Sequence, residues 1–246
     1  MRKILIALGI IAVAALVGVA VVELRPSPGS TKGSASSGGQ SFADAPTMPF
    51  TVFPDDRVMG KADAPVTIIE YASFTCPHCA HFDTDVLPAV KPALIDSGKA
   101  KLVFRDYPLD ALALRAAMLV RCAGNDRAFG MIDLLFQRQM QWATAQDPKA
   151  GLLGIANQAG LSEADFDACM ANQDVQNAVV QSRVTAEQAY KIGSTPSFLI
   201  NGRLAVGAPT AEQLMQMVDS LLPGGAAAPA PSNSPSSPSS SSTPER

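Results

Sequence analysis

The chain has 246 residues, enough for one good-sized domain or two small ones. Hydrophobic residues make up 47% of it and charged residues 17%, which predicts a folded core and excludes global disorder. Its formal net charge of −3 gives no basic footprint for nucleic acid, so we expect no nucleic-acid partner.

The N-terminus differs in kind from the rest of the chain. Arg2 and Lys3 precede an unbroken apolar run over residues 4–22. This run is longer than a usual signal-peptide core and close to the length of about 20 residues that spans a bilayer. We predict an uncleaved signal-anchor over residues 1–24 that holds the protein in a bacterial inner membrane. A signal peptide cleaved after Ala20 is the alternative.

The two N-terminal cations also predict where the remainder of the chain lies. Cations that precede an apolar segment tend to stay in the cytoplasm, so the rest of the chain is expected on the periplasmic, extracytoplasmic side. Cleavage of the signal would instead leave a free periplasmic protein. Disulfides persist in that compartment, and the four cysteines are interpreted accordingly.

Two segments of low complexity flank one predicted domain. Residues 25–46 are rich in Ser, Gly and Pro, which is typical of a flexible linker. Residues 223–246 are an Ala/Pro/Ser tail, which we expect to be disordered because it has little apolar surface to offset the entropy of ordering. The folded unit is therefore predicted over residues 47–222.

The first part of this unit predicts a βαβ arrangement. Residues 64–73 are a nearly continuous run of β-branched and aromatic residues, typical of a strand buried on both faces of a sheet. A helix is predicted from about Pro77, with a kink at Pro88 and an end at Gly98. Residues 100–108 predict the next strand.

The second part begins with a long helical stretch. Residues 109–192 contain no convincing strand, and Ser162 is placed to cap one of the helices. A hairpin is then predicted around Asn201-Gly202. Thr210 and Gln213 form the capping box of a final helix. The element order predicts a mixed α/β sheet.

The stretch SFTCPHCAHF carries the chemistry. Haem attachment needs a histidine directly after the second cysteine, and Ala80 occupies that place. A reactive dithiol fits better, because the N–H groups at the start of the predicted helix stabilise a thiolate at Cys76. His78 can donate a further hydrogen bond to the same sulfur. A stabilised thiolate makes the oxidised Cys76–Cys79 pair a stronger oxidant.

Two other interpretations of the motif stay open. Cys76, Cys79 and His81 could bind copper or zinc, although a structural zinc site usually needs a second pair of ligands nearby. A purely structural disulfide between the two cysteines would stabilise little, because the loop that it closes is very short. We expect no metal at the motif.

Three stretches carry a resemblance to a known family. They are IIEYASFTCPHCAHF, VFRDYPL and GSTPSFLING, in this order and within about residues 50–222. Together they resemble the DsbA-like thiol–disulfide oxidoreductases, whose version of the motif is Cys-Pro-His-Cys. The resemblance implies an α/β, thioredoxin-like fold with a helical insertion, here about 109–192, between βαβ and ββα halves.

The resemblance also implies roles for individual residues. Cys76 would be the exposed nucleophile and Cys79 the buried resolving cysteine of a redox-active disulfide. Thr195-Pro196 would be a peptide bond to a cis-proline, packed against the dithiol, where a substrate backbone pairs. DsbA oxidases commonly have valine before this proline, whereas Thr195 resembles the disulfide isomerases.

Two further assignments rest on the same resemblance. Glu70 matches the family's buried acid, which handles the proton of the resolving cysteine; a satisfied salt bridge is the alternative, since a buried acid is costly unless used or paired. Cys122 and Cys169 match a structural disulfide of the insertion, with two unpaired thiols as the alternative. Closing that loop is worth roughly 3 to 4 kcal/mol.

These observations predict an exported dithiol oxidase. Its substrates would be reduced or unfolded exported proteins, and a membrane or soluble redox partner would reoxidise it. No metal or organic cofactor is expected, and a monomer is favoured because no dimerisation domain is found. A disulfide isomerase or reductase, suggested by Thr195, and a periplasmic Cu/Zn-binding module are the alternatives.

Overall fold

The computed structural model describes residues 42–224. The predicted signal-anchor, most of the predicted linker and nearly all of the predicted tail lie outside these residues. Within the described part, no helix is both long and apolar enough to cross a membrane.

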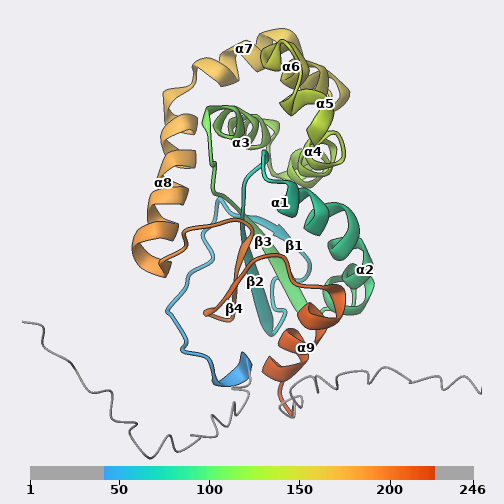
Figure 1. Ribbon diagram of the computed structural model, residues 1–246, viewed down its shortest axis with the longest axis vertical. Coiled ribbons are helices and arrows are strands. Elements are labelled where there is room, and N and C mark those ends of the chain that lie inside the picture. The colour runs from blue at the N-terminus through green and yellow to red at the C-terminus, as the bar shows by residue number, and fades with distance from the viewer. Residues whose placement is uncertain (1–41, 225–246) are drawn as a thin grey trace, which may run out of the picture. The chain divides into compact units, whose positions relative to one another are not determined.

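A five-stranded mixed sheet forms the centre of this unit (Figure 1). Its strand order is β1-β3-β2-β4-β5. Strands β2 and β3 are parallel, and the other neighbouring pairs are antiparallel. The strands are β1 (Arg57–Met59), β2 (Val66–Ala72), β3 (Ala100–Asp106), β4 (Ser197–Ile200) and β5 (Arg203–Val206). The predicted mixed sheet is confirmed.

Strand β2 lies between β3 and β4, and all seven of its residues are buried. This matches a strand whose sequence is apolar on both faces rather than alternating. Strand β1 was missed by the sequence analysis. Its three residues are too few to show a periodicity, and they form a strand by pairing with the edge of β3.

The helix after the cysteine motif follows one continuous path from Pro77 to Asp96. It comprises α1 (Pro77–His81), the π-turn η2 (Phe82–Val86), α2 (Leu87–Lys91) and the π-turn η3 (Pro92–Asp96). A proline has no N–H to donate to the preceding turn. Pro88 follows η2 by two residues, and Pro92 is the first residue of η3. The predicted end of this helix near Gly98 is confirmed: the helix ends at Asp96, two residues before Gly98, which has φ +83°.

Six helices separate β3 from β4, as predicted for the insertion. They are α3 (Ala111–Ala123), α4 (Asn125–Gln137), α5 (Gln139–Ala143), α6 (Pro148–Gln158), α7 (Glu163–Ala171) and α8 (Gln173–Tyr190). Helix α8 packs on one face of the sheet, and α2 and α9 (Ala211–Leu221) pack on the other (Figure 1). The predicted caps at Ser162 and Thr210 are both present as capping boxes.

The N-terminal boundary of the folded unit is earlier than predicted. Phe42 begins a short 3-10 helix and packs against the core on the α9 face. Arg203 Nε donates to the carbonyl of Ala43 over 2.9 Å. Residues 42–46 are therefore part of the domain rather than of a linker, because one aromatic side chain and one backbone carbonyl bind them to it.

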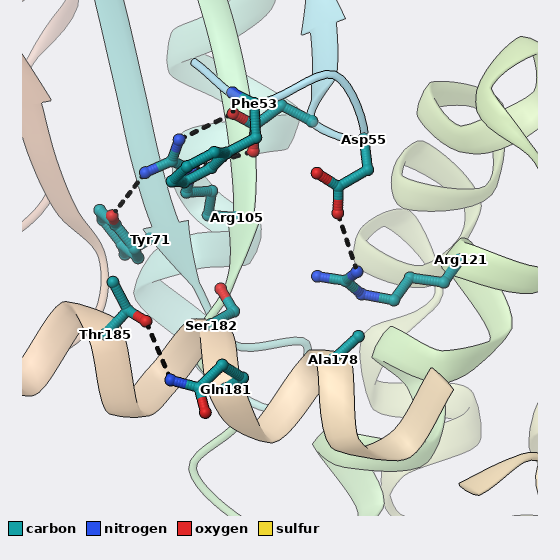
Figure 2. A pocket seen from close by; sticks show the side chains of 10 residues that line it. Phe53, Asp55, Tyr71, Arg105, Arg121, Ala178, Gln181, Ser182 and Thr185 are labelled. Carbon is teal, nitrogen blue, oxygen red and sulfur yellow. Dashed lines mark hydrogen bonds and ion pairs between the residues drawn. The ribbon is translucent and has the colours of Figure 1, made fainter. Parts of the chain in front are cut away.

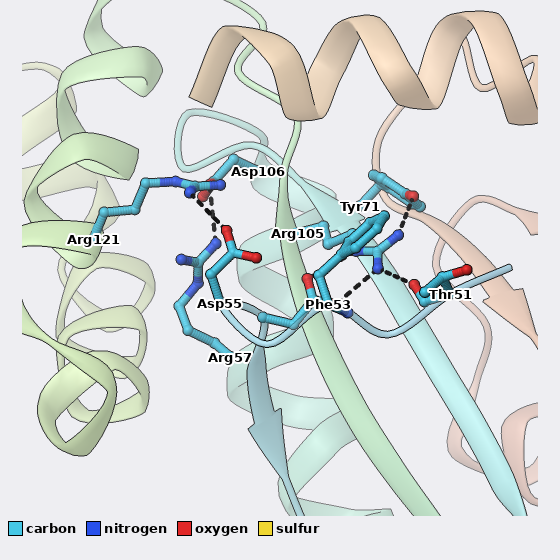
Figure 3. A network of polar contacts seen from close by, with 9 residues as sticks. Thr51, Phe53, Asp55, Arg57, Tyr71, Arg105, Asp106 and Arg121 are labelled. Atoms are coloured by element: carbon cyan, nitrogen blue, oxygen red, sulfur yellow. Dashed lines mark hydrogen bonds and ion pairs between the residues drawn. The ribbon is translucent and has the colours of Figure 1, made fainter. Parts of the chain in front are cut away.

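Buried ion pairs bind residues 56 and 57, at the start of β1, to β3 (Figure 3). Arg105 donates to both carboxylate oxygens of Asp56, at 3.0 and 2.7 Å, and to the Tyr71 hydroxyl at 2.9 Å. Asp106 Oδ2 accepts from Arg57 at 3.0 Å and from Arg121 at 2.7 Å. The Arg105–Asp56 pair joins the segment before β1 to β3, and Asp106 joins β1 and α3 to the end of β3.

A disulfide crosses the helical insertion. Cys122 on α3 is bonded to Cys169 on α7, 47 positions later in the chain. Around it, α3, α4, α6 and α7 share one apolar core.

Replacing both Cys122 and Cys169 by alanine should lower the free energy of unfolding by about 3 to 4 kcal/mol, because the unfolded chain regains the entropy of an open loop. Urea unfolding followed by the fluorescence of the single tryptophan, Trp142, measures this. A loss below about 1 kcal/mol would show that the bond constrains the unfolded chain far less than its loop length suggests.

Candidate active site

Cys76 lies between the end of β2 and the start of α1. Its backbone is extended, with φ −86° and ψ 118°, and it is the N-cap residue of α1, with Pro77 following it. The N–H of Cys76 donates to Ser73 O over 3.1 Å, which turns the chain between strand and helix. Cys79 lies one turn into the helix, so both sulfurs are on its inner side.

The two cysteines differ less in exposure than the resemblance implied. Cys79 is 0% exposed, but Cys76 is only 6% exposed, so the expectation of an exposed nucleophile is wrong for the residue as a whole. The cause is the loop that precedes β4. The Cys76 sulfur lies 3.4 Å from Thr195 O and donates to it when protonated.

The Thr195–Pro196 peptide bond is cis, and it forms the cover of the dithiol. The Thr195 hydroxyl oxygen is buried and has no hydrogen-bond partner. The carbonyl of Pro196 accepts from the Gly207 N–H over 2.9 Å, which ties this loop to the end of β5. Thr195 and Pro196 are thus next to the Cys76 sulfur.

Hydrogen bonds make Cys76 acidic. The Cys79 thiol donates to the Cys76 sulfur, and this bond contributes most to lowering the pKa of Cys76 to about 5. Burial opposes the effect, while the backbone N–H groups of Cys79 and His78 lower the pKa further. Cys76 is therefore a thiolate at neutral pH when the pair is reduced.

Cys79 has the opposite character. Burial, followed by its hydrogen bond to Cys76 and the nearby Glu70, raises the pKa of Cys79 far above that of an ordinary thiol. Cys79 keeps its proton while Cys76 loses its own. The reduced pair therefore contains one thiolate and one thiol in direct contact.

Glu70 is the only carboxyl group on β2, and it is 1% exposed. Its Oε1 has no hydrogen-bond partner. Burial, then the charges of Asp83 and Cys76, raise the pKa of Glu70 well above its usual value. Within residues 42–224 no cation pairs with it, so the salt-bridge alternative is wrong.

The histidines lie away from the sulfurs. The His78 side chain is exposed, and the group that contacts the thiolate is the backbone N–H of His78 rather than the imidazole that the sequence suggested. His81 Nδ1 lies 2.7 Å from Asp85 Oδ2 on the helix surface. In the described part of the chain, no group of three or more His, Cys, Asp or Glu side chains could hold a metal ion.

Three residues near the dithiol were missed by the sequence analysis. Thr75 Oγ1 donates to Asp110 Oδ2 over 2.6 Å, which joins the loop before Cys76 to the start of α3. Gln139, at the start of α5, donates to backbone carbonyls of the same loop. Asp110 and Ser162 both have the residue type of a helix N-cap. The sequence does not indicate that Asp110 also contacts the loop over residues 73–76, called the redox loop below.

A hollow beside the sheet is a separate feature (Figure 2). It has a volume of about 270 Å³ and lies between the segment around Phe53, the sheet and α8. Arg105 and Arg121 line it, but both are already ion-paired with aspartates. Neither Cys76 nor Cys79 lines this hollow.

Comparison with known proteins agrees with this geometry. A family model described as thioredoxin matches residues 53–220. The chain belongs to this family. It is 28% identical to a putative protein-disulfide oxidoreductase of Rickettsia bellii over 62% of this chain and 60% of the relative, and 30% identical to that of Rickettsia typhi over 62% and 57%. The chain thus spans about 60% of the length of these curated relatives.

A solved structure extends the likeness to the fold. The crystal structure of Wolbachia pipientis alpha-DsbA1 is 29% identical and has a TM-score of 0.64. The match covers 71% of this chain and 92% of that one. The thioredoxin-like fold with its helical insertion, and the resemblance to DsbA proteins, are therefore confirmed.

Replacing Glu70 by glutamine should stabilise the protein increasingly as the pH rises. Folding raises the pKa of Glu70, so the folded state keeps a proton that the unfolded chain loses above about pH 4.3. That mismatch costs stability from about pH 4.3 upward, toward the raised folded pKa, and Glu70→Gln removes it. Urea unfolding of both oxidised proteins at pH 5 and pH 8 measures the difference.

The exposed Glu163 provides the matched control, because Glu163→Gln removes a carboxylate on the surface of α7. Its effect on the free energy of unfolding should be the same at both pH values. A Glu70→Gln effect that is equally independent of pH would contradict a carboxyl group kept protonated by burial.

Proposed function

We propose that the protein is an extracytoplasmic thiol–disulfide oxidoreductase that introduces disulfides into exported proteins. The observation that carries this proposal is the contact between an acidic Cys76 sulfur and a buried, non-acidic Cys79. A stabilised Cys76 thiolate lowers the free energy of the reduced pair, so the oxidised pair tends to accept electrons. The relatives named as putative protein-disulfide oxidoreductases support the same chemistry.

The reaction begins with the Cys76–Cys79 disulfide. A substrate thiolate attacks the Cys76 sulfur, a new bond forms between the two proteins, and the Cys76–Cys79 bond breaks. Cys79 leaves with the electron pair and takes up a proton. We propose that the nearby Glu70 supplies this proton. Thr195 and Pro196 lie beside Cys76, where we propose that the substrate backbone pairs.

The second thiolate of the substrate then attacks its own sulfur in the mixed disulfide. Cys76 leaves as a thiolate, which its low pKa favours, and the substrate now holds the disulfide. Two electrons have passed to the Cys76–Cys79 pair. A redox protein in the membrane or in solution must remove them before the next cycle.

The proposed setting follows from the predicted N-terminal segment. Residues 1–24 would anchor the chain in a bacterial inner membrane, with the dithiol on the outer side as a monomer. Cleavage after Ala20 would leave the same domain free in the periplasm. The second candidate function is a disulfide isomerase or reductase. Thr195 favours it, because threonine before the cis-proline resembles the isomerases and this residue lies against the Cys76 sulfur.

Single-turnover trapping tests the proposed reaction. Oxidised protein mixed with a reduced peptide containing two cysteines should yield one peptide disulfide per Cys76–Cys79 pair, counted by mass spectrometry after acid quenching. Cys76→Ser should abolish this transfer. Cys79→Ser, first activated at Cys76 as a mixed disulfide with a small thiol, should accumulate the peptide-bound form when the peptide has only one cysteine, because no second thiol can then release Cys76.

Two results would go against the proposal. Equal reactivity of the two single variants would mean that Cys76 is not the attacked sulfur. Faster repair of a mispaired peptide disulfide than oxidation of the reduced peptide would favour the isomerase instead.

A further inference from the structure

The side chain of Gln139 holds the backbone on both sides of Cys76. Its Nε2 donates to Phe74 O and to Cys76 O, each over 2.9 Å. Gln139 is 6% exposed, and both bonds are buried. A side-chain amide nitrogen has two hydrogens, so this group uses its full donor capacity on the redox loop.

These two carbonyls belong to the peptide groups that flank the Cys76 region. The Cys76 carbonyl also accepts from the Ala80 N–H over 3.1 Å, which is the first hydrogen bond of the helix. A carbonyl oxygen has two lone pairs, so both bonds can exist together. Gln139 therefore sets how the first helical turn, with its thiolate-stabilising N–H groups, is oriented relative to the Cys76 sulfur.

The other end of Gln139 is firmly supported by the insertion. Trp142, on the same short helix, is buried and donates from Nε1 to Leu135 O over 2.7 Å. Helix α6 packs very closely against it: a Cβ added to Gly151 would lie 3.0 Å from Trp142 Cα. The donor amide thus projects from a part of the insertion that has little freedom to move.

We propose that Gln139 is a positioning residue through which the helical insertion sets the acidity and the oxidising strength of the dithiol. The inference rests on the proposed function, since it concerns the same Cys76 thiolate. Gln139 does not touch the sulfurs. It acts by fixing the two carbonyls that determine where the backbone N–H groups of His78 and Cys79 point.

Gln139→Met tests this, because methionine has a similar length but no donors. The pKa of Cys76, followed by thiolate absorbance at 240 nm, should rise by about one unit. The equilibrium constant for oxidation of glutathione should fall about tenfold at pH 7, which corresponds to about 30 mV for a two-electron couple. Gln141→Met, on the same helix but exposed, should change neither quantity.

Loss of thermal stability in Gln139→Met with an unchanged Cys76 pKa and glutathione constant would overturn the inference, because Gln139 would then be only a structural support. A wild-type Cys76 pKa near 8.5, the ordinary value, would overturn the proposed function together with it. The two failures are therefore distinguishable.

Wild-type protein gives a second test if the variant fails to fold. The side-chain amide protons of Gln139 should exchange slowly with solvent and change chemical shift at the pH where Cys76 titrates. Exchange as fast as that of the exposed Gln141 amide, with no response to this titration, would overturn the inference.

Discussion

A thiolate has to be stabilised at Cys76 in a place nearly closed to water, and the surrounding structure serves that requirement. A buried charge is costly unless hydrogen bonds replace the lost hydration. Here the donors are the Cys79 thiol and the backbone N–H groups of the first helical turn. The buried strand β2 ends four residues before Cys76 and so places it in the interior, and the loop with the cis Thr195–Pro196 bond covers its sulfur.

The same burial acts in opposite directions on neighbouring groups. Cys79 and Glu70 lack enough donors, so burial raises the pKa of each and both keep their protons. Cys76 has the donors and loses its proton. In the proposed reaction this asymmetry would give each sulfur one role: Cys76 would leave as a thiolate, whereas Cys79 would accept a proton from the nearby Glu70.

Much of this was predictable because it depends on local signals. The apolar run of β2, the cysteine motif at a helix start and the Thr210 capping box each predict a local structure that is confirmed. Strand β1 depends on pairing with β3, and the near-complete covering of Cys76 depends on a loop 119 positions away. The role of Gln139 was invisible for the same reason, since a glutamine in a helical stretch gives no indication that its amide reaches Phe74 and Cys76.

The reduction potential of the Cys76–Cys79 pair tests the central claim most directly. It would be measured by equilibration with glutathione buffers, with alkylation and mass spectrometry separating this pair from Cys122 and Cys169. The account predicts an oxidising value, nearer the approximately −120 mV of DsbA than the approximately −270 mV of thioredoxin. A value at or below that of thioredoxin would contradict it, because the Cys76 thiolate would then not be stabilised enough to make the pair a donor of disulfides.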